Sequence, residues 1–268
     1  MPPFRLLLYA ASLGAVLFSV RAMLIATPPL WVSACVALAY VGLILGGVFV
    51  LRWRAYVDAI IAGPPRARGV VLTFDDGPDP EWTPRVLDAL ERANAVATFF
   101  VIGKKAEQHP QLVREILARG HSVGLHSYAH DRLFSLRSER RVRDDLAHAM
   151  QVLADILGEA PALFRPPIGH TNPIIARVAD AMDLTVIGWS VSGHDGLARA
   201  DAEHVVRRIR RGLRDGAIVL LHDAAERGTH EPAGVKALPA VLAAITDAQL
   251  PVVPLRSFLA EECEECED

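Results

Sequence analysis

Two adjacent aspartates, Asp75 and Asp76, end the apolar run of residues 70–74 and precede a Gly-Pro turn. Side-by-side carboxylates repel each other, and apolar surroundings add a desolvation cost. A cation or a network of hydrogen-bond donors at this point would offset both costs. A DDG turn taken alone is most often a solvated turn, so the pair gains meaning only from the residues that accompany it.

Histidine, arginine and aspartate follow apolar runs farther along the chain. His126 and His130 are four residues apart in "HSYAH", a spacing that puts both imidazoles on one face if the segment is helical. Arg165 precedes two prolines, and Asp195 and His222 follow later apolar runs. Two neutral imidazoles and one carboxylate form a three-ligand site for Zn²⁺ or a similar divalent ion, with one position left open. One aspartate can then bind the metal while the other accepts a proton.

Short apolar runs alternate with stretches that carry apolar residues at helical spacing. The runs cover residues 70–74, 96–102, 121–126, 162–164, 184–190, 217–222 and 251–255. Such alternation predicts an α/β domain with a parallel sheet or barrel of about seven strands. In α/β barrels the catalytic residues gather at the C-terminal ends of the strands. The candidate residues above all follow such runs, so we expect them to meet.

The remaining histidines have weaker signals. His170 and His194 lie near the candidate residues and are expected to line the site at most. The other histidines lack a partner pattern and are predicted to be structural or solvent-exposed: His109, His121, His148, His204 and His230.

Four motifs make residues 70 to about 258 resemble the NodB-type polysaccharide deacetylases, carbohydrate esterase family 4. They are "TFDDGP", "HSYAH" in the pattern H-[ST]-x-x-H, "RPPIG" in the pattern R-P-P-x-G, and "LLH". The resemblance implies a distorted (β/α)₇ barrel. It also implies hydrolysis of the N-acetyl group of an amino sugar, with release of acetate.

The resemblance assigns one set of residues to a metal and to the attacking water. Asp76, His126 and His130 would hold a divalent metal ion, Zn²⁺ in the first place and Co²⁺ as an alternative. Asp75 would be the general base that deprotonates the water. Arg165 would pair with that base and fix its charge.

A second set of residues is implied to act on the acetyl group and the leaving amine. The backbone N–H of Ile168 would stabilise the oxyanion together with the metal. Leu220 would line the pocket for the acetyl methyl group. His222 would be the general acid that protonates the amine, and Asp195 would orient it.

One family motif departs from its usual form. This further motif lies between "RPPIG" and "LLH" and is the family's fourth in chain order. It is usually D-x-x-D-W, but here it is "SGHDG", with Ser192 and Gly196 in place of the first Asp and the Trp. The Trp normally forms one wall of the sugar pocket. Its loss suggests a bulkier or differently oriented sugar than that of a standard chitin-like or peptidoglycan chain.

The N-terminal part of the chain is expected to cross a membrane. The chain is 51% hydrophobic with a mean hydropathy of +0.26, and the excess lies at the front. Uncharged runs flanking Arg21 predict two transmembrane helices, at about residues 6–26 and 30–51, joined by Pro28-Pro29 as a helical hairpin. A cleaved signal peptide or a single anchor is the alternative.

Arginines at the open end of the hairpin suggest its orientation. They are Arg5 before the first helix and Arg52, Arg54, Arg66 and Arg68 after the second. By the positive-inside rule the catalytic domain faces the cytoplasm of a multi-pass protein in a bacterial-type inner membrane, although an extracytoplasmic domain stays open. A cytoplasmic location favours a lipid-linked N-acetylhexosamine over a wall polymer as substrate, with membrane lipid around the hairpin.

The predicted organisation has four parts. Residues 1–54 form the membrane unit, 55–69 a linker, 70–259 the deacetylase domain, and 260–268 an acidic, disordered tail that contains Cys263 and Cys266. A net charge of −3 gives no indication of a nucleic-acid partner. Two other functions remain open, namely a deformylase or O-acetyl esterase on a sugar, and a degenerate membrane-anchored glycan-binding module.

Overall fold

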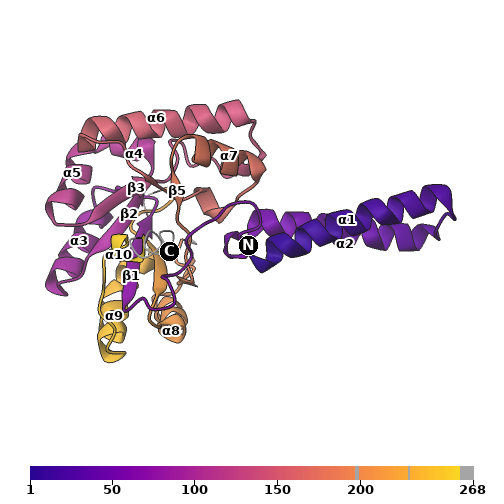
Figure 1. The fold of residues 1–268 in the computed structure, drawn as a ribbon. Helices are drawn as coiled ribbons and strands as arrows, with labels where there is room; N and C mark the ends of the chain where they lie inside the picture. Colours follow the sequence, from indigo (N-terminus) through magenta and orange to yellow (C-terminus); the bar gives the residue numbers. More distant parts are fainter. Residues whose placement is uncertain (197–198, 229, 260–268) are drawn as a thin grey trace, which may run out of the picture.

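The computed structural model describes residues 1–196, 199–228 and 230–259, and the tail with Cys263 and Cys266 lies outside these ranges. Two units are visible in Figure 1. A pair of long helices projects from a domain in which helices surround a sheet. The described chain therefore has the expected order, with a helical unit in front of an α/β domain.

The two long helices, α1 (Pro3–Leu24) and α2 (Leu30–Phe49), pack against each other as a hairpin (Figure 1). Ser12 Oγ and Tyr40 Oη are 2.9 Å apart across this contact. Both helices are long and apolar enough to cross a membrane, and almost none of their surface is buried in the protein. The helices start and end within a few residues of the expected bounds. Pro3 occupies the first turn of α1, where proline is tolerated, and α2 ends before Val50, which leaves helical geometry.

The domain contains a seven-stranded sheet whose paired strands are all parallel. The strands are β1 (Val70–Asp75), β2 (Ala97–Val101), β3 (Ser122–Leu125), β4 (Leu163–Phe164), β5 (Thr185–Val186), β6 (Val191–Ser192) and β7 (Ala217–His222). Their order is β5-β4-β3-β2-β1-β7-β6. The two edge strands, β5 and β6, are consecutive in the chain, so the sheet curls toward closure as a distorted (β/α)₇ barrel. The predicted fold class is confirmed.

Amphipathic helices cover the outside of this sheet (Figure 1). They are α3 (Trp82–Arg92), α4 (Gly103–Gln108), α5 (Pro110–Ala118), α6 (Glu139–Leu157), α7 (Pro173–Ala181), α8 (Ala202–Gly212) and α9 (Ala233–Asp247). The short α10 (Arg256–Leu259) instead packs Phe258 against the inner face of the sheet. On α3, for example, Val86, Leu87 and Leu90 are fully buried against the sheet. Their spacing of one, three and four residues is that of a single apolar stripe.

The two faces of each strand have different roles. Leu72 and Phe74 of β1 belong to the main core beneath the helices. Val71, on the opposite face, packs in a smaller cluster with Phe100 and Ile218. Because side chains alternate along a strand, the face of Val71 also carries Thr73 and then Asp75. The barrel interior therefore changes from apolar side chains at its lower end to polar ones at the C-terminal ends of the strands.

Two segments differ from the prediction. Residues 251–255 form only one bridge, between Val252 and Val70, so β6 rather than this run completes the seven strands. The expected linker, residues 55–69, packs on the domain, with Ile60 bridging to Ile187 and Ala62 to Ala217. The edge strands β5 and β6 have only two residues each, so backbone groups beside them lack a strand partner. Residues 55–69 provide partners for these groups at Ile187 and Ala217.

Candidate metal and catalytic site

Asp75 and Asp76 both point into one cavity at the C-terminal end of β1. Consecutive residues of a strand would face opposite sides of the sheet. The chain avoids this because Asp76 takes a left-handed conformation, with a φ of 73°. An unusual backbone at a non-glycine residue is typical of a functional site. The turn that follows is tight, since a side chain at Gly77 would collide with the carboxylate of Asp223.

His126 and His130 also reach this cavity, but they do so from a loop. The segment is not helical, so the i, i+4 spacing is not what places both imidazoles on one side. Ser127 and His130 have φ values of 61° and 48°, and the carboxylate of Asp145 accepts hydrogen bonds from the backbone N–H groups of Tyr128 and Ala129. These bonds stabilise a turn that a helix could not form, and the turn brings the two imidazoles together.

Asp76, His126 and His130 form a cluster whose ligand atoms lie within 4.8 Å of one another. Oδ1 of Asp76 is 3.5 Å from Nε2 of His126 and 3.2 Å from Nε2 of His130, yet this buried oxygen has no hydrogen-bond partner among the described residues. A buried carboxylate oxygen without a donor is costly. The chemistry of these three donors fits a divalent metal ion.

The protonation state of His126 suits a metal ligand. Its Nδ1 is 2.8 Å from the carbonyl oxygen of Arg165, so Nδ1 carries the proton and Nε2 has a free lone pair. Burial lowers the pKa of His126 to about 4, against the opposing effect of the nearby aspartates. The imidazole is therefore neutral near pH 7, as a metal ligand must be.

Arg165 is fully buried and pairs with Asp75. Its guanidinium donates to Oδ1 of Asp75 at 2.7 Å and to Thr73 Oγ1 at 2.9 Å, and it stacks 4.1 Å above the ring of Phe100. Its Nε and Nη2 groups donate further bonds to the carbonyl oxygens of Ile187 and Gly188. Oδ1 of Asp75 is thereby fixed, while Oδ2 faces the cavity 3.8 Å from His126 Nε2.

His222 faces Asp75 from the neighbouring strand, because the register of β1 and β7 pairs these two residues. Its Nδ1 is 3.2 Å from Oδ1 of Asp195, and its backbone N–H donates to Oδ2 of the same carboxylate at 2.7 Å. Burial disfavours a charged ring, but Asp195, together with the smaller effects of Asp76 and Asp75, outweighs burial and raises the pKa of His222 to about 10. His222 can therefore carry a proton at neutral pH, opposite an aspartate that can accept one.

Comparison with known proteins agrees with this geometry. A family model described as polysaccharide deacetylase matches residues 62–187. A chitooligosaccharide deacetylase of Bradyrhizobium is 40% identical over 58% of this chain and 71% of its own length. The chain belongs to the polysaccharide deacetylase family.

Other members of this deacetylase family act on peptidoglycan, according to their names. The peptidoglycan-N-acetylglucosamine deacetylase PgdA of Listeria monocytogenes is 42% identical over 63% of this chain, which spans only 36% of that relative's length. The crystal structure of the Bc1960 peptidoglycan N-acetylglucosamine deacetylase superimposes with a TM-score of 0.68 at 31% identity, over 74% of this chain and 91% of the other.

The remaining walls of this family member's cavity, which has a volume of about 480 Å³, come from Ile168, Gly169, Trp189 and Leu220. Ile168 has a φ of 49° in the turn after Pro167. The N–H groups of Gly169 and His170 donate to carbonyl oxygens within this turn, whereas that of Ile168 takes no part in these bonds. The structure thus brings Ile168 and Leu220 to the site with all the predicted metal and acid–base residues.

The departure in the fourth motif leaves this family member without an aromatic wall at Gly196. Gly196 lies against the ring of His222, and an added Cβ would be 2.9 Å from Nε2. A tryptophan does not fit there in this arrangement. Of the two histidines expected at the margin, His194 lines the catalytic cavity, whereas His170 lies in a neighbouring cavity.

Glu226 and Arg132 belong to the site but were missed by the sequence interpretation. Nδ1 of His130 has no hydrogen-bond partner among the described residues, and Oε1 of Glu226 is 3.4 Å from it. Arg132 holds this glutamate with a bond of 2.7 Å to Oε1. The only signal in the sequence was an acid four residues after His222, in a stretch without a recognised motif.

The substitution Glu226→Gln is expected to weaken metal binding by about 10–100-fold, the usual effect of removing a carboxylate that orients a ligating histidine. Metal affinity should be measured by competition with a chromophoric chelator. The exposed Glu203→Gln, on α8, is a matched control that should bind metal as the wild type does. Equal affinities in both variants would show that Glu226 does not orient His130.

Proposed function

We propose that the protein is a metal-dependent N-deacetylase that hydrolyses the acetamido group of an N-acetylated amino sugar and releases acetate. The observation that carries this proposal is that Asp75 and His222, paired across β1 and β7, line the same cavity as the Asp76, His126 and His130 cluster. Relatives named as N-acetylglucosamine and chitooligosaccharide deacetylases support the same substrate class. The metal is proposed to be Zn²⁺, with Co²⁺ as an alternative.

A divalent ion on Asp76, His126 and His130 would act as a Lewis acid toward the acetyl carbonyl and the attacking water. Asp75 accepts the proton of that water through Oδ2, and the bond from Arg165 to Oδ1 keeps the carboxylate charged and oriented. His222 donates a proton to the amine nitrogen as the C–N bond breaks.

The remaining residues handle the acetyl group and orient the acid. The N–H of Ile168 donates to the oxyanion that forms at the carbonyl. Leu220, buried at the floor of the cavity, contacts the acetyl methyl group. Asp195 keeps His222 protonated and oriented through its two bonds to that residue.

The proposal is tested by measuring the acid released from a set of sugars by the full-length protein. We expect acetate from N-acetylglucosamine-containing oligosaccharides and no acid from the same sugars after chemical N-deacetylation. Formate from an N-formyl sugar, or acetate only from O-acetylated sugars, would instead identify a deformylase or an esterase. No release from any sugar, together with retention on a glycan column, would identify a binding module.

The hairpin of α1 and α2 is proposed to span a bilayer, with the catalytic domain in the cytoplasm. Both helices meet the length and apolarity of membrane spans, and arginines are concentrated at the open end of the hairpin. Arg5 at this end is not free, since it pairs with Asp58 at 3.0 Å and also donates to the carbonyl oxygens of Arg54 and Ala55. These bonds attach the start of α1 to the segment that follows α2.

Reporter fusions at the C-terminus check this orientation. A reporter that works only in the cytoplasm is expected to be active, and one that works only after export is expected to be inactive. Fusions at Thr27, in the loop between the helices, are the matched control and should give the opposite pattern. Export-dependent activity at the C-terminus would place the catalytic domain outside and favour an extracytoplasmic polymer as substrate.

A further inference from the structure

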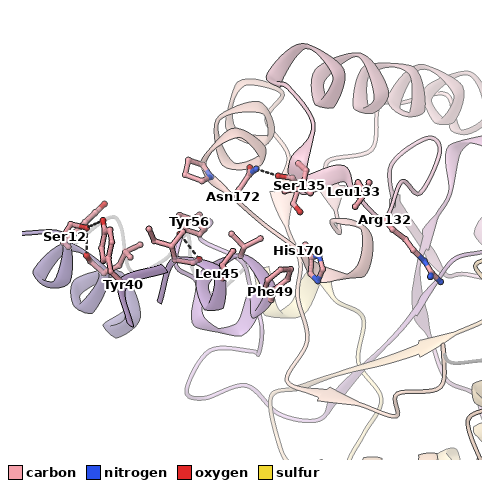
Figure 2. Close-up of a pocket in the computed structure, with 16 residues that line it drawn as sticks. Ser12, Tyr40, Leu45, Phe49, Tyr56, Arg132, Leu133, Ser135, His170 and Asn172 are labelled. Carbon is pink, nitrogen blue, oxygen red and sulfur yellow. Dashed lines mark hydrogen bonds between the residues drawn. The ribbon is translucent and has the colours of Figure 1, made fainter. Parts of the chain in front are cut away.

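A second cavity, of about 620 Å³, lies where the hairpin meets the catalytic domain (Figure 2). The hairpin contributes mainly apolar side chains, among them Leu45 and Phe49 of α2. The domain contributes Leu133 and Leu136 from the loop after His130. In Figure 2 the ring of Phe49 lies beside His170, and their ring centres are 4.8 Å apart. The cavity thus lies between two units of the protein and is open on one side. Its lining is mostly apolar, and the domain adds polar groups from Arg132, Ser135, His170 and Asn172.

This apolar cavity adjoins the catalytic cavity. Arg132 lines both of them. On the other side of Phe49 a smaller cavity of about 160 Å³ shares Ile168 and Trp189 with the catalytic cavity. The apolar cavity and the catalytic cavity are thus neighbours, with Arg132 on one boundary between them and Phe49 with the smaller cavity on the other.

Large apolar side chains are exposed around these openings. Leu133 is 51% exposed and Leu136 is 75% exposed, and Ile168 is also exposed. In the described part of the catalytic domain, only Leu117 joins them among exposed large aliphatic side chains. Their concentration at one place indicates a surface that binds something apolar.

The position of the cavity relative to a bilayer points to the class of ligand. A helix of 20 residues, the length of α2, extends about 30 Å, which equals the thickness of the hydrocarbon core. If α2 spans that core, Phe49 at its end lies at the membrane surface and Leu45 lies just below it. The cavity then opens at the boundary between hydrocarbon and water.

The charges between the cavities suit the head group of a lipid. Arg52 lines the smaller connecting cavity and Arg132 lines the larger opening. Arg132 is paired with Glu226, whereas Arg52 makes no ion pair within the described residues. A phosphate that follows a hydrocarbon chain out of the bilayer would meet these guanidinium groups before its sugar reaches Asp75 and His222.

We propose that the apolar cavity holds the hydrocarbon chain of a lipid-linked N-acetylated amino sugar, and that the phosphate of this lipid lies near Arg52 and Arg132. The inference rests on the proposed deacetylase function and names the substrate class of that site. It explains why apolar residues of a catalytic-domain loop face a membrane hairpin instead of a core. It does not depend on which side of the membrane the domain faces.

The test uses full-length protein in nanodiscs of phosphatidylethanolamine and phosphatidylglycerol. Two probes carry N-acetylglucosamine on a phosphodiester, one esterified to farnesol and the other to methanol. For each protein the ratio of kcat/KM for the farnesyl probe to that for the methyl probe is measured. Because both values come from the same sample, a loss of folded protein cancels in the ratio.

Two tryptophan substitutions on α2 form a matched pair. Leu45→Trp would fill the cavity, whereas Leu38→Trp, on the same helix, lies away from it. Leu45 is 46% exposed and Leu38 is 72% exposed, so each position has room for the larger side chain. Exclusion of two methylene groups should lower the ratio about tenfold or more in Leu45→Trp. Partitioning of the farnesyl chain into the nanodisc is common to both variants and cannot produce the difference.

Equal ratios in Leu45→Trp and Leu38→Trp would overturn the inference, while turnover of the methyl probe would leave the deacetylase function intact. If the wild type releases acetate from neither probe and from none of the N-acetylated oligosaccharides above, the proposed function fails, and a binding measurement decides on the cavity. A farnesyl probe with a photoreactive diazirine should label α2 in the wild type and in Leu38→Trp, but not in Leu45→Trp. Equally strong labelling by a diazirine-bearing phosphatidylglycerol would show that the cavity holds bulk lipid, and would also overturn the inference.

Discussion

Asparagine at position 75 is expected to lower kcat by about 10²–10⁴-fold without loss of the metal, because only the proton acceptor is removed. The amide oxygen of Asp75→Asn can still accept the bond from Arg165, but it cannot take a proton from water. The three metal ligands are unchanged. Turnover should be measured by acetate release, and metal content by elemental analysis of the same sample.

The buried partner of Asp75 requires a control for folding. Arg165 is 0% exposed, and removing one charge of a buried pair typically costs about 3–5 kcal/mol. Thermal unfolding of Asp75→Asn must therefore show a folded protein at the assay temperature. Asp88→Asn, which removes an exposed carboxylate paired with Arg119, is the matched variant and should keep both stability and turnover. Near wild-type turnover in folded Asp75→Asn would exclude this residue as the base.

Removal of the metal should abolish acetate release, and Zn²⁺ or Co²⁺ should restore it. The physical reason is the buried Oδ1 of Asp76, which has no donor within the described residues and lies next to the imidazoles of His126 and His130. Without a cation this site has neither a Lewis acid for the carbonyl nor compensation for its carboxylate. Activity should be measured after dialysis against a chelator and again after metal is added.

Substitutions of histidine connect that loss to the proposed ligands. His130→Ala should fail to bind a metal ion at concentrations that saturate the wild type, whereas the exposed His204→Ala should bind it normally. Full activity of the chelated protein, with metal absent by elemental analysis, would contradict the mechanism at its first step.

The sequence was most informative where chemistry limits the choice of residue. Asp75, Asp76, Arg165 and His222 were recognisable because several polar groups follow successive apolar runs and fall in motifs that resemble one family. The structure places them together, as the alternation of strands and helices predicted. Their roles in the reaction remain predictions until the substitutions above are measured.

Other features depend on contacts between distant segments and left little local signal. The turn that joins His126 to His130 is held by Asp145 from α6, so the spacing of four residues did not reveal how the two imidazoles meet. Residues 55–69 contain Pro and Gly and resemble a linker. Ile60 nevertheless pairs with Ile187, beside β5, and Ala62 pairs with Ala217 of β7. Glu226 contacts His130 only because the loop after β7 folds back over the site.

One backbone bond has a kinetic consequence. The N–H of Thr171, just after the turn that contains Ile168, donates to the carbonyl oxygen of Val48 at 3.0 Å. With α2 in a bilayer, this bond helps to hold the mouth of the barrel at a constant height above the lipid. Enzyme and membrane-borne substrate would then meet by diffusion in a plane, at an effective concentration set by surface density. Dilution with inert lipid would slow the reaction, whereas dilution of the same vesicles with buffer would leave the rate per enzyme unchanged.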